Sequence, residues 1–121
     1  MKITEADFKL FQEEFLKWVE RYGCTGWEIH FDWEETSDTV DAYISPDCTG
    51  QTVTVTLGTD VSRPSEVGIK FLAFHEATEL FLTKLRHQAM AREFSLGAFQ
   101  SEIHQIINIL KKLVFDNVPR I

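Results

Sequence analysis

Three residues in the second half of the chain have the types and the spacing of a metal site. His75, Glu76 and Glu79 lie in a segment, residues 73–81, that is rich in helix-forming residues and contains no Pro or Gly. In a helix, His75 and Glu79 lie one turn apart on the same face, and Glu76 lies about 100° round from His75. This is the layout of the H-E-x-x-H zinc motif, in which the Glu acts as a general base. Carboxylate oxygen also binds zinc, so Glu79 can take the place of the second His.

A catalytic zinc site commonly has three protein ligands and leaves a fourth position for water. The third ligand must come from another element, and a helix expected at residues 98–117 is the natural candidate, since short connections make consecutive helices antiparallel neighbours. His104 is the only His of that helix and lies at the edge of its apolar stripe, while Glu102 at the opposite edge is the competing donor. We therefore predict a zinc site formed by His75, Glu79 and His104. Glu76 would take a proton from the acidified water, which is chemistry that hydrolyses amides.

The elements that must position these residues follow from the apolar spacing. A first helix is expected from a Thr4 and Asp7 capping pair to a Gly23 C-cap. A second helix at residues 65–87 carries the motif, with Phe71, Phe74 and neighbouring apolar residues forming its buried face. Because this helix is apolar over most of its circumference, we expect His75, Glu76 and Glu79 to be largely buried.

Three strands are predicted between these helices, at residues 27–34, 39–44 and 51–57. The first alternates strictly between aromatic or Ile residues and polar ones, so one face is buried. Short separations favour antiparallel neighbours. The third strand is lined by Thr and carries no charge, so it is either an edge open to peptide pairing or a strand with one solvated face. The expected fold class is α+β, with a three-stranded antiparallel sheet.

Composition limits the classes of function. The 121 residues predict a single domain, and a net charge of −7 without a basic stripe argues against a nucleic-acid partner. No apolar run approaches the length of a membrane span, and the first residues lack the apolar core of a signal peptide. We therefore expect a cytoplasmic protein in which Cys24 and Cys48 are free thiols.

The order of these elements resembles the zincin metallopeptidases in a minimal form. In particular, it is similar to small phage-encoded metallopeptidases, which carry a Trp-led strand like Trp27-Glu28-Ile29 and a helix like Phe74-His75-Glu76. The resemblance covers about residues 26–116, and only the motif helix is specific. In the gluzincin type, a Glu from a downstream helix completes H-E-x-x-H. The resemblance implies that Glu79 replaces the second His and that His104 occupies the downstream position.

Other interpretations of the same residues remain open. His75 and Glu79 could form a structural pair with each other or with Arg86, without a metal. A zincin-like scaffold could also bind peptides without hydrolysing them. No residue can be assigned as the group that stabilises the transition state, and Tyr43 and Arg86 are candidates for it. The leading prediction is a zinc-dependent peptidase acting on peptide or protein substrates.

Overall fold

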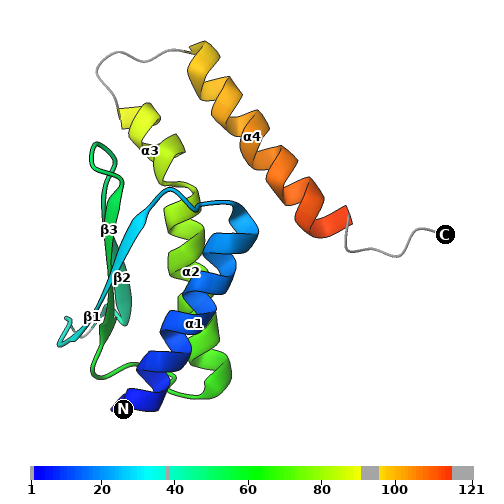
Figure 1. Cartoon of the computed structure of the whole chain (residues 1–121). Helices are drawn as coiled ribbons and strands as arrows, with labels where there is room; N and C mark the ends of the chain where they lie inside the picture. Colours follow the sequence, from blue (N-terminus) through cyan, green and yellow to red (C-terminus); the bar gives the residue numbers. More distant parts are fainter. Residues whose placement is uncertain (1, 38, 91–95, 116–121) are drawn as a thin grey trace.

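The computed structural model describes residues 2–37, 39–90 and 96–115 of the chain. Two long helices lie side by side against one face of a three-stranded sheet, and two further helices continue beyond the end of this layer (Figure 1). The fold class is therefore α+β, as predicted. In chain order the elements are α1 (Glu5–Tyr22), β1 (Glu28–Glu34), β2 (Ala42–Asp47), β3 (Thr52–Gly58), α2 (Glu66–Phe81), α3 (Thr83–Met90) and α4 (Leu96–Phe115).

Helix α1 begins and ends where its capping residues predict. Thr4 Oγ1 accepts a hydrogen bond from the Asp7 backbone N–H at 3.2 Å, and the Asp7 carboxylate accepts one from the Thr4 N–H at 3.0 Å. Gly23 ends the helix in the left-handed conformation, with φ of 72°, which glycine adopts without strain. Four residues spaced along one side of α1 are buried against the rest of the protein: Phe11, Phe15, Val19 and Tyr22.

The sheet is mixed, which corrects the predicted antiparallel arrangement. The strand order is β1-β3-β2, with β3 antiparallel to β2 but parallel to β1. β3 takes the centre because it is uncharged and largely buried on both faces, with even Thr56 only 1% exposed. β2 contains Pro46, which lacks a backbone N–H and suits an edge strand. The possibility that β3 is an edge open to peptide pairing is therefore wrong.

The predicted alternation of β1 is confirmed. Ile29, Phe31 and Trp33 are half-buried, and the residues between them are exposed. Phe31 packs edge-on against Phe15 of α1, with ring centroids 5.5 Å apart, and Trp33 stacks on Phe8 at 5.4 Å. These aromatic contacts fasten α1 to the outer part of the sheet.

Helix α2 covers the sheet beside α1, but with a different face from the predicted one. Ile69, Ala73, Ala77 and Leu80 are fully buried, whereas Phe71 is 62% exposed. The two alanines allow the α2 backbone to lie close to the sheet, so the apolar stripe at spacings of four and three residues faces inward. Phe71 and Phe74 are left on the outer side, which corrects the predicted buried face.

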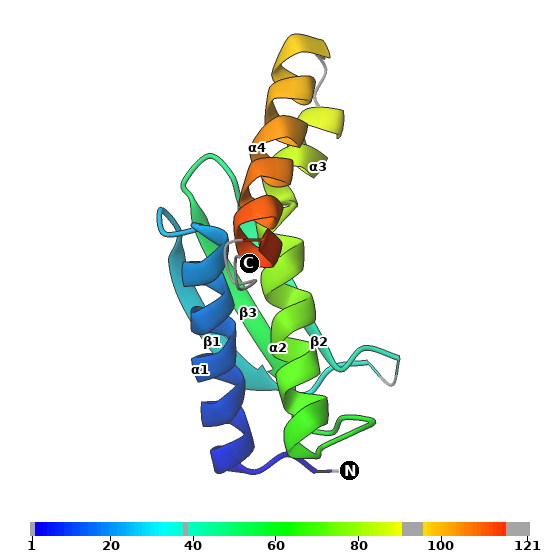
Figure 2. The same ribbon diagram turned by 90° about the vertical axis from the view of Figure 1, so that its right-hand side faces the viewer.

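The predicted helix over residues 65–87 is interrupted at Leu82, where α2 ends and α3 begins. Leu82 has φ of −88° and ψ of −2°, at the margin of the right-handed helical region. The hydroxyls of Thr78 and Thr83 each donate to the carbonyl four residues earlier, at 2.8 Å, a contact that bends helices. Beyond the break, α3 continues past the end of α1 (Figure 2).

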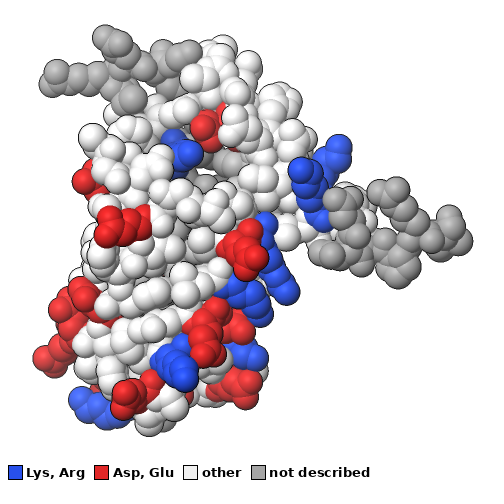
Figure 3. All heavy atoms as spheres, in the orientation of Figure 1, with Lys and Arg blue, Asp and Glu red and all other residues white. Residues whose placement is uncertain are grey.

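Helix α4 packs chiefly against α3 and the end of α1, and none of its described residues is buried. Several of its large apolar side chains are exposed, including Ile107, Leu110 and Val114. Cys24 and Cys48 are free thiols. No helix in the described ranges combines the length and the apolar character needed to cross a bilayer. On the face drawn in Figure 3, acidic and basic side chains are mixed.

Candidate metal centre

Helix α2 brings together three of the residues that the sequence singles out. One possible ligand atom from each of His75, Glu76 and Glu79 lies within 4.8 Å of the others. The three residues occupy positions i, i+1 and i+4, so a single turn of one helix supplies all three groups. This group, which we call the α2 triad, is the cluster of possible metal ligands found among the described residues.

Glu76 points from this turn into the protein. It is only 3% exposed, and its Oε2 has no hydrogen-bond partner among the described residues. The pKa of Glu76 is raised from 4.5 to about 8, chiefly by burial and also by the charge of Glu79 and a hydrogen bond with that residue. A buried carboxyl group with one unpaired oxygen is costly unless it serves a purpose, and such groups are concentrated at functional sites.

His75 and Glu79 lie at the surface beside Glu76. Their side chains are 55% and 36% exposed, and His75 Nε2 lies 3.9 Å from Glu79 Oε1. Arg86 of α3 approaches the same carboxylate, with Nη2 3.8 Å from Glu79 Oε1. The expectation that the whole triad is buried is therefore wrong for these two residues, since α2 faces the sheet with its opposite side. Their exposure leaves the triad open to an ion and to a substrate from solvent.

The predicted third ligand is not part of this group. His104 lies on α4 with an exposed side chain, and the structure does not bring it within the triad. The break at Leu82 sends α3 and α4 away from α2, so α4 does not run back along the helix that carries the motif. Its role as a ligand stays a prediction.

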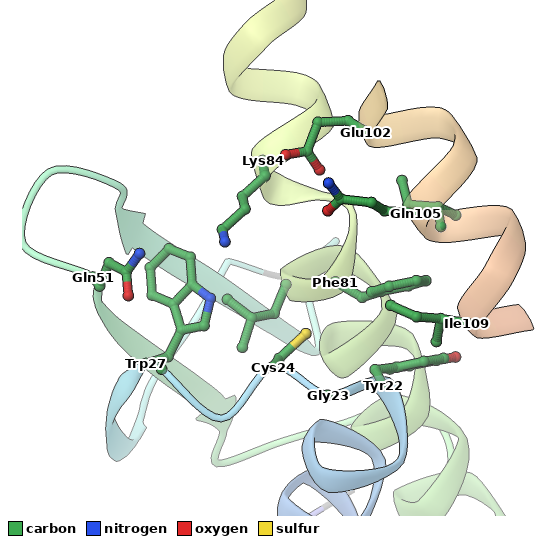
Figure 4. Close-up of a pocket in the computed structure, with 13 residues that line it drawn as sticks. Tyr22, Gly23, Cys24, Trp27, Gln51, Phe81, Lys84, Glu102, Gln105 and Ile109 are labelled. Atoms are coloured by element: carbon green, nitrogen blue, oxygen red, sulfur yellow. The ribbon is translucent and has the colours of Figure 1, made fainter. Parts of the chain in front are cut away.

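The competing donor, Glu102, also lies elsewhere. It lines a cavity of about 150 Å³ at the junction of α4, α3 and the end of α1, together with Lys84, Cys24 and Trp27. Figure 4 shows the Lys84 side chain extending towards Trp27, while Glu102 lies beside Gln105 on α4. Burial raises the pKa of the Cys24 thiol, and the positive charge of Lys84 opposes this rise. This cavity is separate from the triad.

The two candidates for a transition-state-stabilising group are placed differently. Tyr43 alternates along β2 with Ala42 and Ile44, which join the hydrophobic core, so its ring lies on the opposite face of the sheet from α2. Its hydroxyl donates to Glu34 Oε1 at 3.4 Å. Arg86, in contrast, contacts Glu79 and is the cation beside the triad.

One feature near the triad escapes the sequence analysis. Phe71, assigned to the core, is exposed one turn before His75, with the two ring centroids 6.3 Å apart. The spacing of Ala73 and Ala77 is the signal that could have revealed this, because small residues mark the side of a helix that approaches another layer closely.

Comparisons of the chain with models of protein families, with curated proteins and with solved structures give no match. The function must therefore be argued from the triad itself.

The donors of the triad are suited to a divalent metal ion. One imidazole nitrogen and carboxylate oxygens are accepted ligands for zinc and for harder metals such as manganese. The unpaired Glu76 Oε2 is a buried polar atom that faces no other partner among the described residues. The α2 triad could thus hold a metal ion, with His75 and Glu79 open to solvent and Glu76 behind them.

Proposed function

We propose that this protein is a zinc-dependent peptidase in which His75 and Glu79 hold the metal and Glu76 is the general base. The observation that carries the proposal is the buried Glu76, whose carboxyl lies within 4.8 Å of ligand atoms of both exposed residues. A general base works best when its pKa is near the working pH, and burial moves the pKa of Glu76 towards that range.

A zinc ion held here would supply positive charge that lowers the pKa of a water molecule and polarises a peptide carbonyl. The chain's own contribution is to place a proton acceptor beside that water. Glu76 carries a proton in the metal-free protein at neutral pH, since burial raises its pKa to about 8. Beside a bound cation this pKa would fall, because an opposite charge favours the ionised form. Metal binding would therefore ionise Glu76 and so make it able to accept a proton.

Two positively charged or titratable groups lie near the Glu79 carboxylate. Arg86 and His75 both approach its Oε1, at 3.8 and 3.9 Å. Contacts to a ligating carboxylate fix its orientation and tune its basicity. Arg86 is also the residue best placed to neutralise negative charge that develops on a substrate bound at the triad.

A second function is favoured by the same contacts. His75, Glu79 and Arg86 can satisfy one another without a metal, as the distances of 3.8 and 3.9 Å indicate. In that case the protein is a peptide-binding domain without turnover. Exposed ion pairs of this length contribute little to stability, so the pairing alone gives only weak support for a purely structural role.

Hydrolysis measured with and without Glu76 separates the two functions. The parent protein, loaded with zinc, is incubated with an unfolded protein such as casein, and new amino termini are counted. We expect Glu76→Gln to retain zinc and to reduce the rate at least a hundredfold, because loss of a general base costs about 10²–10⁴-fold. Glu102→Gln, which changes a carboxylate in the separate cavity, is the matched control. Equal rates in the parent and Glu76→Gln would reject the proposed mechanism.

A further inference from the structure

A cavity lies at the beginning of α2, about one helical turn before the triad. It has a volume of about 410 Å³ and is lined on the α2 side by Val67, Gly68, Phe71 and Leu72. This volume is within the range of about 300–1,000 Å³ that is typical of ligand pockets. We call it the Phe71 pocket. Phe71 lies between the pocket and the triad, since it lines the pocket and its ring centroid is 6.3 Å from that of His75.

The pocket and the triad share one face of α2. Gly68, Leu72, His75 and Glu79 follow one another at spacings of four, three and four residues, which places them in a row along the helix. Four residues separate Phe71 from His75, a rise of about 6 Å along the helix axis. An extended peptide covers this distance with about two residues. A peptide whose cleaved bond lies at the triad would therefore place a side chain two or three positions away in the pocket.

The opposite wall of the pocket is fixed by hydrogen bonds. Asp41 Oδ1 accepts from both the backbone N–H and the hydroxyl of Ser62, each at 3.3 Å. Ser65 caps α2 by accepting from the Gly68 N–H at 3.1 Å. A Cβ atom on Gly68 would lie 2.1 Å from the Arg63 carbonyl oxygen, so this approach of loop and helix requires glycine. The wall is thus formed before any ligand binds.

The exposed apolar residues of the pocket have no structural task in the fold. Val67 is 77% exposed and Phe71 62% exposed, although both belong to a helix with a well-buried opposite face. Neighbouring apolar side chains of this size on a surface, beside a candidate catalytic site, are typical of a binding surface.

We infer that the Phe71 pocket binds a large apolar side chain of the peptide substrate, of the size of Leu, Met or Phe, two or three residues from the cleaved bond. This inference rests on the proposed peptidase function. The pocket would give the proposed peptidase a preference among peptide substrates, which the triad alone does not provide. Burial of such a side chain against Phe71 and Val67 supplies the selectivity, and the amount expected from an apolar pocket is about tenfold or more.

The test uses capped eight-residue peptides of Gly and Ala, with a single Phe or a single Ser placed in turn at each position. Binding is measured by fluorescence anisotropy with zinc-loaded Glu76→Gln, which does not cleave them. We expect at least one Phe peptide to bind about tenfold more tightly than its Ser counterpart. The further change Phe71→Ser should reduce this difference to less than twofold. Leu16→Ser, at an exposed apolar residue of α1, is the matched control and should leave the difference unchanged.

Equal affinity for Phe and Ser peptides at every position would contradict the inferred role of the pocket. A preference for Phe peptides that persists in Phe71→Ser would contradict it as well. The same peptides are then offered to the parent protein as substrates. Cleavage without any preference for Phe would contradict the inferred role of the pocket and would support the proposed peptidase function. Phe-dependent binding without cleavage would support the pocket and reject the peptidase. Val67→Ser, at a second exposed position, should weaken Phe binding in the same direction and guards against a local distortion by Phe71→Ser.

Discussion

Helix α2 lies on the sheet beside α1 and buries six of its residues, whereas α4 buries none of its described residues. The two helices differ in the elements against which they pack. Ile69, Ala73 and Leu80 hold α2 on the sheet, and Phe81 stacks on Tyr22 of α1 with centroids 4.5 Å apart. Helix α4 rests on α3 and the end of α1 through half-buried side chains, and leaves Ile107 and Leu110 exposed.

A preorganised site can form on α2 but not on α4. A ligand or catalytic group must be held to a fraction of an ångström, and this requires a helix whose own position is fixed by packing. The triad on α2 meets this condition. His104 on α4 does not share this support, because its helix gains little burial from its present neighbours.

The largest expected effect concerns the packing itself. Leu80→Ala removes a fully buried side chain of α2 and should lower the free energy of unfolding by about 2–5 kcal/mol. Leu110→Ala removes a side chain of α4 that is 42% exposed, and we expect a loss below about 1 kcal/mol. Urea denaturation followed by circular dichroism measures both. Similar losses in the two variants would show that α4 is packed as firmly as α2.

The second prediction concerns the dependence of stability on pH in protein freed of metal by a chelator. The folded-state pKa of Glu76 is about 8, whereas the ordinary value is 4.5, so folded protein keeps a proton that unfolded protein has lost. The contribution of Glu76 is complete below pH 4.5 and is lost as the pH rises to about 8. The free energy of unfolding should fall by a few kcal/mol over this range.

Glu76→Gln should remove this decline, because an amide does not titrate. Glu102→Gln should retain it. Urea denaturation at intervals between pH 5.5 and 9 gives the slopes, and the same slope in the parent and Glu76→Gln would contradict the burial of an ionisable group at this position.

A smaller effect is expected when one accepted zinc ligand replaces another. Glu79→His keeps a donor atom at this position with a similar bond length to zinc, so the protein should still bind zinc, with an affinity within about tenfold of the parent. The substitution also removes the contact between Glu79 and Arg86. Competition with a chromogenic zinc chelator measures the affinity. Complete loss of zinc in Glu79→His would indicate that the carboxylate has a structural task that imidazole cannot fulfil.

The smallest effect is expected at the outer side of α2. Phe71→Ser should change the free energy of unfolding by no more than about 0.5 kcal/mol, since the side chain is 62% exposed. Thermal unfolding of the parent and the variant gives the comparison. A loss of several kcal/mol would place Phe71 in the core, as its position in the apolar pattern predicts.

Local features of the fold could be predicted from the sequence because they depend on neighbours along the chain. The capping pair of Thr4 and Asp7, the left-handed Gly23 and the alternation of β1 each involve residues within one turn or one strand. The closeness of His75, Glu76 and Glu79 is of the same kind, since helical spacing alone brings them together.

Features that depend on packing between distant segments could not be predicted. The central place of β3 follows from burial on both faces, and a pattern of alternating Thr and Val is equally typical of an edge strand. The break at Leu82 involves no Pro or Gly, and the positions of Phe71 and His104 follow from which sides of α2 and α4 find partners. Apolar periodicity shows that a helix has an apolar side, but it does not show what that side meets.

The proposed function depends on a metal ion bound by His75 and Glu79 of the α2 triad. Zinc is measured by elemental analysis of the parent, Glu79→Ala and His104→Ala, each purified without added metal and dialysed against the same trace of zinc. We expect about one zinc per chain in the parent and almost none in Glu79→Ala, because removal of Glu79 leaves too few protein ligands to hold zinc. Loss of zinc in His104→Ala as well would make His104 a third ligand. Equal zinc in the parent and Glu79→Ala would contradict metal binding at the triad.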